Sequence, residues 1–204
     1  QNIFSEYYNA SVTIATQKNN VFVFIPSSED NQYYYINNHK IEKEITKNTC
    51  SPKTINKGLN ERLIFPYKYN ENGEVEKYTE KEFKTNFPQT YKYLKSHYDE
   101  LMGRKKDSSS QWFEYGRSQA LKNANKEKLL MSIVITKQVK VYHLDKDTIP
   151  YSGIYITAKN NNNIIKAKEN LESKLFYDYV QNIGITSGVN SIRITSRDVN
   201  NFKF

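Results

Sequence analysis

Apolar residues recur every three or four positions between Phe87 and Leu101, which is the period of an amphipathic helix. Pro88 suits the first position of such a helix, and Gly103 follows as a natural C-terminal cap. A second helix of this kind is expected over 164–179. Each helix must bury its apolar face against another element, so the chain is predicted to contain a packed core.

The other apolar runs are short and rich in β-branched and aromatic residues, as is typical of strands. The runs 11–16 and 21–25 flank the polar turn 17–20 and predict an N-terminal β-hairpin. Further strands are expected at 33–36, 62–65, 128–135, 138–143, 151–158 and 189–194. Strands and helices do not alternate strictly, so we predict an α+β fold: a single mixed domain with short sheets and two longer amphipathic helices.

The polar loop 107–110 is a candidate hinge. It predicts sub-lobes over 1–106 and 111–204 within one domain that spans 1–204. Thr79 and Glu82 have the spacing of a capping box, which predicts a short helix that begins beside them.

The composition excludes several classes of protein. Aromatic residues make up 14% of the chain, which argues against disorder although the hydrophobic fraction is 37%. No apolar run approaches the roughly 20 residues that span a bilayer. Cys50 is the single cysteine, so an internal disulfide and a Cys-based zinc cluster are excluded, and the three histidines lack metal-ligand spacing. We therefore expect a cytoplasmic chain without metal, and the start at Gln1 suggests a part of a longer protein.

Positive charge is concentrated in the stretch 104–140. It holds nine basic and three acidic residues, a net charge of +6 out of +8 for the whole chain. Basic residues interleaved with aromatic ones are typical of proteins that bind a polyanion such as nucleic acid. A solvated lysine-rich surface is the alternative interpretation.

The most unusual stretch lies within this basic region and runs from Gln111 to Ala120. Arg117 and Gln119 are residue types that pair with guanine and adenine in the major groove, and Gly116 would let the backbone approach a partner closely. Alternatively, Trp112 and Phe113 belong to the core and Arg117 pairs with Glu114.

Signals for catalysis are weak. No nucleophile elbow or phosphate-binding glycine loop occurs, and Cys50 lies in a polar stretch without a neighbouring base. Glu82-Phe-Lys84 has the spelling of a magnesium-dependent nuclease triplet, but no Asp lies between residues 31 and 98 to complete it.

Several blocks resemble the C-terminal specificity domain of TaqI-like DNA adenine-N6 methyltransferases of restriction–modification systems. The most specific blocks are Phe87-Pro-Gln-Thr-Tyr-Lys-Tyr-Leu94, then Leu101 and Arg104, then Trp112-Phe-Glu-Tyr-Gly-Arg-Ser-Gln119. Weaker matches are Val12-Thr-Ile-Ala-Thr16 with Val21-Phe-Val23, Glu42-Lys-Glu44, Leu63-Ile-Phe-Pro-Tyr67, Tyr151-Ser-Gly-Ile-Tyr155, Leu171-Glu-Ser-Lys-Leu-Phe176 and 188–203. The opening block lacks the family's usual glycine. The matches cover nearly the whole chain.

The resemblance implies a target-recognition domain that binds double-stranded DNA as a monomer. The catalytic domain of the same parent chain, with its S-adenosylmethionine pocket, would lie outside this sequence, since the Asn-Pro-Pro-Tyr loop of that domain does not occur here. This chain is thus expected to carry no cofactor and no catalytic residue. The alternatives from other classes are a magnesium-dependent nuclease and a protein-docking domain of a restriction–modification complex.

The candidate DNA-binding residues fall into three groups. The first lies around the unusual stretch and comprises Tyr115, Gly116, Arg117, Ser118 and Gln119. The second contributes positive charge and comprises Arg104, Lys105 and Lys122. The third lies at the expected hairpin turn and comprises Thr16, Gln17 and Lys18. Trp112 and Phe113 are expected to brace the loop rather than to contact bases.

Overall fold

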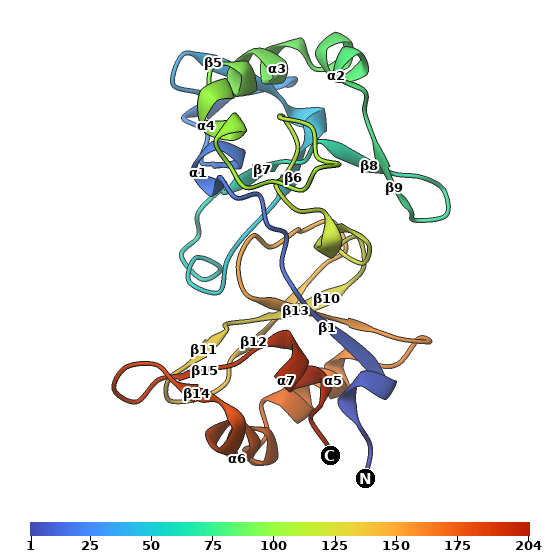
Figure 1. Ribbon diagram of the computed structural model, residues 1–204, viewed down its shortest axis with the longest axis vertical. Coiled ribbons are helices and arrows are strands. Elements are labelled where there is room, and N and C mark those ends of the chain that lie inside the picture. The colour runs from blue at the N-terminus through green and yellow to red at the C-terminus, as the bar shows by residue number, and fades with distance from the viewer. The chain divides into compact units, whose positions relative to one another are not determined.

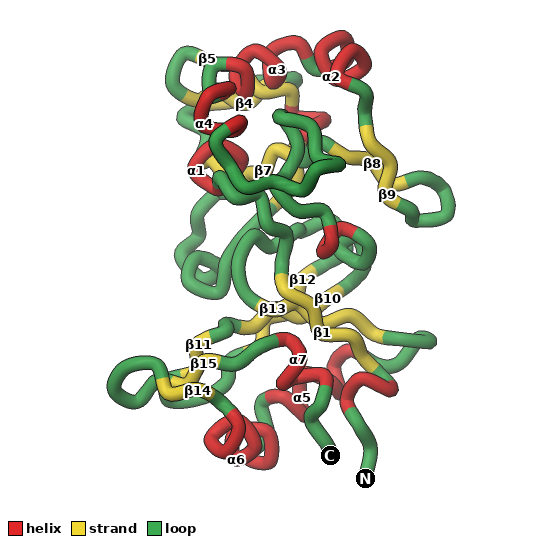
Figure 2. Tube along the Cα trace, viewed as in Figure 1, coloured by secondary structure: helices red, strands yellow, loops and turns green.

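The N-terminal residues pair with the C-terminal part of the chain rather than with the residues that follow them. The computed structural model describes all residues 1–204. The chain forms two compact units, and most contacts join residues of the same unit. Unit 1 comprises 1–13, 126–146 and 152–204, and unit 2 comprises 14–125 and 147–151. This division differs from the expected sub-lobes 1–106 and 111–204, because 107–125 belongs to unit 2 and 1–13 belongs to unit 1. Both units combine helices with short antiparallel sheets, which confirms the α+β class (Figures 1 and 2).

Unit 1 is built on a four-stranded antiparallel sheet with the strand order β1-β13-β10-β12. These strands are β1 (Tyr8–Val12), β13 (Ile154–Ala158), β10 (Lys128–Met131) and β12 (Val141–Leu144). A second sheet has the order β11-β15-β14 and comprises β11 (Val134–Ile135), β15 (Ile192–Arg193) and β14 (Ile185–Thr186). Because β1 pairs with β13 along its whole length, the start of the chain is fixed by a strand almost 150 residues further on.

The helices of unit 1 lie on one side of this sheet (Figure 1). They are η1 (Phe4–Glu6), α5 (Ile164–Leu171), α6 (Lys174–Ile183) and α7 (Ser196–Asn200). Helix α5 contacts β10 and β12, and α7 contacts β1. The core between them includes Leu129, Ile156, Ala167, Phe176 and Phe202, all fully or almost fully buried. The two ends of the chain are hydrogen-bonded to each other in this unit, through Asn2 and Phe204.

Unit 2 contains three small antiparallel sheets. The first has the order β2-β7-β6 and comprises β2 (Val23–Phe24), β7 (Arg62–Ile64) and β6 (Thr46–Asn48). The second comprises β3 (Ser28–Glu29), β4 (Tyr33–Ile36) and β5 (His39–Glu42), and the third comprises β8 (Tyr67–Tyr69) and β9 (Val75–Lys77). The helices are α1 (Asn19–Phe22), η2 (Lys43–Ile45), α2 (Glu80–Asn86), α3 (Pro88–Lys95), α4 (Tyr98–Met102) and η3 (Gln119–Leu121). Helix α3 packs along β5.

The predicted N-terminal hairpin is wrong. Strand β1 ends at Val12 and belongs to unit 1, whereas Val23 and Phe24 pair with β7 in unit 2. The turn between them does not fold back, because the Thr16 side chain accepts a hydrogen bond from the Lys18 backbone and contacts Asn19, where α1 begins. A hydroxyl that bonds backbone groups just ahead of it favours a helix start over a two-residue hairpin turn.

Both long helices are interrupted. The helix expected over 87–101 breaks at Ser96, whose hydroxyl donates to the Tyr93 carbonyl at 2.5 Å. The helix expected over 164–179 breaks at Ser173, which caps α6 by accepting from the Phe176 backbone at 3.2 Å. The restart changes the helical phase, so Leu175, predicted to be in the core, is exposed, and Phe176 is buried in its place. The capping box of Thr79 and Glu82 is confirmed at the start of α2.

Candidate nucleic-acid interface

The stretch singled out by the sequence forms a loop in unit 2, which we call the 104–122 loop. It begins after α4 and ends with η3. Arg104, the first residue of the loop, is held in place by its own guanidinium. This group donates three hydrogen bonds to backbone carbonyls: 2.9 Å to Leu101, 2.6 Å to Thr16 and 2.9 Å to Trp112. Burial lowers the pKa of Arg104. Arg104 therefore holds three segments of unit 2 together, and its donors are not directed toward a DNA partner as the sequence suggested.

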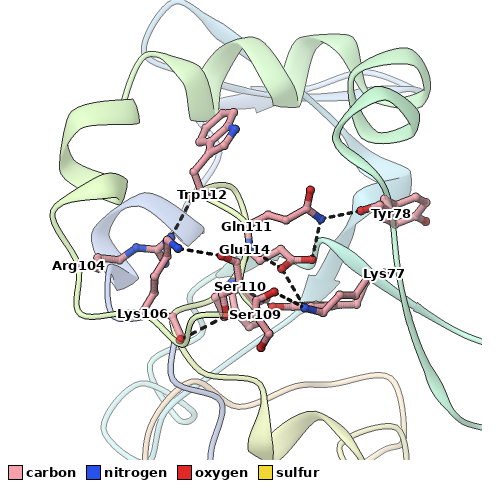
Figure 3. Close-up of polar contacts among 12 residues, drawn as sticks. Lys77, Tyr78, Arg104, Lys106, Ser109, Ser110, Gln111, Trp112 and Glu114 are labelled. Atoms are coloured by element: carbon pink, nitrogen blue, oxygen red, sulfur yellow. Dashed lines mark hydrogen bonds and ion pairs between the residues drawn. The ribbon is translucent and has the colours of Figure 1, made fainter.

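A buried carboxylate organises the middle of the loop. Glu114 is fully buried, and its Oε1 accepts from the Gln111 backbone at 2.8 Å and from Lys77 Nζ at 3.3 Å. The Gln111 side chain donates both to Glu114 Oε2 and to the Tyr78 carbonyl, while Lys77 also donates to the Ser109 carbonyl (Figure 3). Glu114 is therefore paired with Lys77 and not with Arg117, so this part of the alternative is wrong, whereas Trp112 and Phe113 are buried in the core as it proposed. Lys77 was not singled out from the sequence, where it lies 37 positions away.

The aromatic residues of the loop brace it, as expected for Trp112 and Phe113. Trp112 points away from the Glu114 network (Figure 3) and donates from Nε1 to Glu80 at 3.1 Å. Phe113 is fully buried and stacks on Phe83 with a centroid distance of 4.8 Å.

Tyr115 is also part of this scaffold. Its ring is fully buried, its hydroxyl donates to the Ile64 carbonyl at 2.6 Å, and its backbone N–H donates to the Tyr67 hydroxyl at 3.0 Å. Burial raises the pKa of Tyr115 well above its ordinary value. In this position Tyr115 presents no group to DNA, so its assignment as a DNA contact needs correction.

Gly116 is required by a contact within the chain. Its backbone N–H donates to Thr16 and that of Arg117 donates to Ala15, both at 3.1 Å, so the loop runs antiparallel to the segment 15–17. Gln17 lies over Gly116, and a Cβ at this glycine would be only 2.1 Å from Gln17 Oε1. The glycine thus admits the Gln17 side chain rather than the backbone of a partner.

This pairing brings two of the predicted contact groups together. Gln17 and Lys18 lie beside the exposed end of the loop, where Arg117 and Gln119 are exposed and Ser118 is half-buried. The Arg117 guanidinium is 3.3 Å from Asp107, a weak ion pair because the Arg117 side chain is 53% exposed. Lys18 lies 3.6 Å from Glu100. Thr16, by contrast, is buried, and its hydroxyl donates to Asn19 Oδ1 at 2.5 Å and accepts from the Lys18 backbone at 3.0 Å.

The remaining basic residues are divided between the two units. Lys105 and Lys122 are exposed in unit 2, whereas 126–140 belongs to unit 1. Lys128 is fully buried and donates to the Asp145 carbonyl at 2.9 Å. The charge count of the sequence therefore includes a lysine that is not on the surface.

Glu82, the acidic residue of the nuclease-like triplet, has a structural role at the start of α2. Glu82 accepts from the Thr79 backbone in the capping box, which accounts for its carboxylate. No group of three or more His, Cys, Asp or Glu side chains is arranged to hold a metal ion. None of the helices has both the length and the apolar character needed to cross a bilayer.

Comparison with known proteins finds similarity among solved structures. No family model matches the sequence, and no curated protein matches it. Among solved structures, the chain is similar to the Type IIL restriction-modification enzyme MmeI in complex with DNA, with a TM-score of 0.67 and 11% identity. The match covers 98% of this chain and 25% of the enzyme, so the chain spans about a quarter of its length. It shares the fold of that segment.

Proposed function

We propose that this chain is a DNA-recognition domain of a larger restriction–modification enzyme and that it binds duplex DNA with sequence preference. The observation that carries the proposal is the row Arg117, Ser118 and Gln119, in which Arg117 and Gln119 are exposed and Ser118 is half-buried. The row lies beside Gln17 on a scaffold of buried bonds. The same fold in MmeI belongs to an enzyme whose structure contains DNA.

The exposed residues divide by chemistry. Arg117 and Gln119 can each make two parallel hydrogen bonds to a base edge, and Ser118 can donate or accept one. Lys18, Lys105 and Lys122 carry point charges suited to phosphate oxygens, which position a protein without specifying a sequence. Residues 112–116 keep the row in place and make no contact with DNA in this account.

The finer identity rests on the resemblance of the sequence to TaqI-like adenine-N6 methyltransferases. In this proposal the parent is a cytoplasmic enzyme that transfers a methyl group from S-adenosylmethionine, using a catalytic domain outside this chain. The domain acts as a monomer and has no catalytic residue of its own. Isothermal titration calorimetry of the isolated chain with S-adenosylmethionine is expected to give no heat of binding, and a micromolar dissociation constant would contradict this assignment.

A salt titration tests the DNA-binding proposal. The isolated domain is expected to bind mixed-sequence duplex with a dissociation constant of about 10⁻⁴ to 10⁻⁶ M. Each phosphate contact should contribute about −0.9 to the slope of log affinity against log salt. A slope near zero would overturn the proposal and favour a protein-docking domain, and magnesium-dependent cleavage of plasmid DNA would favour the nuclease.

A further inference from the structure

A second cationic feature of unit 2 lies outside the 104–140 stretch. A hollow of about 530 Å³, which we call the α3 hollow, opens on the outer face of α3 beside the end of α2. Three lysines line it: Lys84 from α2, and Lys92 and Lys95 from α3. The rest of the lining is provided by His39, Pro88, Tyr91 and Ser96.

The three lysines have no acidic partner. None of them takes part in an ion pair of the structure. The carboxylate whose charge acts on Lys84 and Lys95 is Glu80, and it already accepts from the Tyr91 hydroxyl at 2.8 Å and from Trp112 at 3.1 Å. Together with burial and His97, the charge of Lys92 lowers the pKa of His39. The hollow therefore has a positive potential that Glu80 offsets only in part, since three lysines face one carboxylate.

Two of the lysines are held against aromatic rings. Lys84 Nζ lies 5.4 Å from the Tyr91 ring centroid, and Lys95 Nζ lies 4.3 Å from that of Tyr98 and 4.8 Å from that of Trp112. Such contacts attract the ammonium group to the ring face, and both lysines remain exposed. They also connect the α3 hollow to the 104–122 loop, since Lys95 lines the hollow and contacts Trp112 of the loop.

The N-terminus of α3 does not supply the anion-binding groups. Glu42 already accepts from the first free backbone N–H groups of this helix, at 3.0 Å from Gln89 and 2.7 Å from Thr90. Any anion that enters the hollow must therefore be bound by the lysines. An apolar floor of proline and tyrosine with cations around it fits a chain of alternating sugars and phosphates better than a small free anion.

We propose that the α3 hollow is a second DNA contact, in which Lys84, Lys92 and Lys95 bind phosphates of one strand and Pro88 and Tyr91 contact its sugars. This inference rests on the proposed function and extends it to a surface that the charge distribution of the sequence does not single out. The contact is independent of base identity, because lysines on phosphates do not distinguish sequences.

The test compares two charge-matched triple variants of the whole chain by fluorescence anisotropy with a short fluorescein-labelled duplex. The first carries Lys84→Glu, Lys92→Glu and Lys95→Glu. The control carries Lys53→Glu, Lys57→Glu and Lys166→Glu, which are exposed lysines that do not line the hollow. At low salt we expect the first variant to bind at least about tenfold more weakly than the control, with a salt slope smaller in magnitude by about two units.

Folding is controlled by thermal melting and by one milder variant. Lys92 makes no ring contact, so Lys92→Glu alone should leave the melting temperature unchanged and reduce the slope by about 0.9. Equal losses in the two triple variants, or an unchanged slope in Lys92→Glu, overturn the inference and leave the proposed function intact. If the wild-type chain itself fails to bind duplex at low salt, the proposed function and this inference fall together.

Discussion

Residues 112–116 and residues 117–119 are consecutive in one loop, yet their surroundings differ completely. The first five are buried, and their polar groups bond to Ile64, Lys77, Glu80 and Thr16 within unit 2. In the next three, Arg117 and Gln119 are exposed and Ser118 is half-buried. An unusual block of sequence can thus consist mainly of residues that support the loop, with the exposed residues confined to its C-terminal end. Changes in the buried part should reduce stability, and changes in the exposed part should reduce binding.

The largest stability effect is expected at Glu114. Glu114→Gln removes the charge that Lys77 and the Gln111 backbone donate to, and places an NH₂ group among donors. Glu114 is fully buried but the Lys77 side chain is 40% exposed, so the loss of these charge-assisted hydrogen bonds should cost about 2 kcal/mol of unfolding free energy. Urea unfolding measures this change in the free energy of unfolding, and Glu76→Gln on the exposed strand β9 is the matched control. A loss no larger than that of the control would show that Glu114 is not part of the support.

A smaller effect is expected at Gly116. Gly116→Ala places a Cβ against Gln17 and should cost about 1 kcal/mol, because the exposed glutamine can move away. The double variant with Gln17→Ala should recover most of the loss. If the two changes are simply additive in a double-mutant cycle, the contact between Gln17 and Gly116 is not what requires the glycine.

The smallest effect depends on pH. Hydrogen bonds from Tyr91 and Trp112 lower the pKa of Glu80 below its ordinary value of 4.5. A lowered pKa in the folded state stabilises the protein above the unfolded-state pKa, and this stabilisation is lost as the pH falls through the folded-state pKa. The difference in melting temperature between wild type and Glu80→Gln should therefore be largest at neutral pH and should shrink below about pH 4.5. A constant difference from pH 7 to pH 3 would contradict this.

Local signals in the sequence were reliable where local bonds decide the structure. The capping box of Thr79 and Glu82 was found as predicted. Trp112 is bonded to Glu80 within unit 2, which is compatible with the bracing role expected of it. The strand partner of β1 could not be predicted, because it lies almost 150 residues away in β13. Breaks at Ser96 and Ser173 were missed because the apolar period continues through both residues, whereas each hydroxyl bonds a preceding carbonyl.

The candidate site was also predictable only where local sequence decides the structure. Exposure of Arg117 and Gln119 follows from a polar run, but the pairing of 15–17 with 116–117 is a long-range contact. The internal roles of Arg104 and Tyr115 could not be inferred from residue type, because arginine and tyrosine serve both scaffolds and nucleic-acid contacts. Lys128 shows the limit of charge counting, since it is fully buried.

We propose that Arg117 and Gln119 contact DNA bases, whereas residues 112–116 hold the loop in place without contacting DNA. The most direct measurement is the affinity of Arg117→Ala for a duplex enriched from a random pool and for a scrambled duplex, with Lys122→Ala as the matched comparison and melting temperature as the folding control. We expect Arg117→Ala to lose about 1–3 kcal/mol on the enriched duplex and much less on the scrambled one. Lys122→Ala should weaken both duplexes equally. Equal losses of Arg117→Ala on the two duplexes, or a large fall in its melting temperature, would contradict the account.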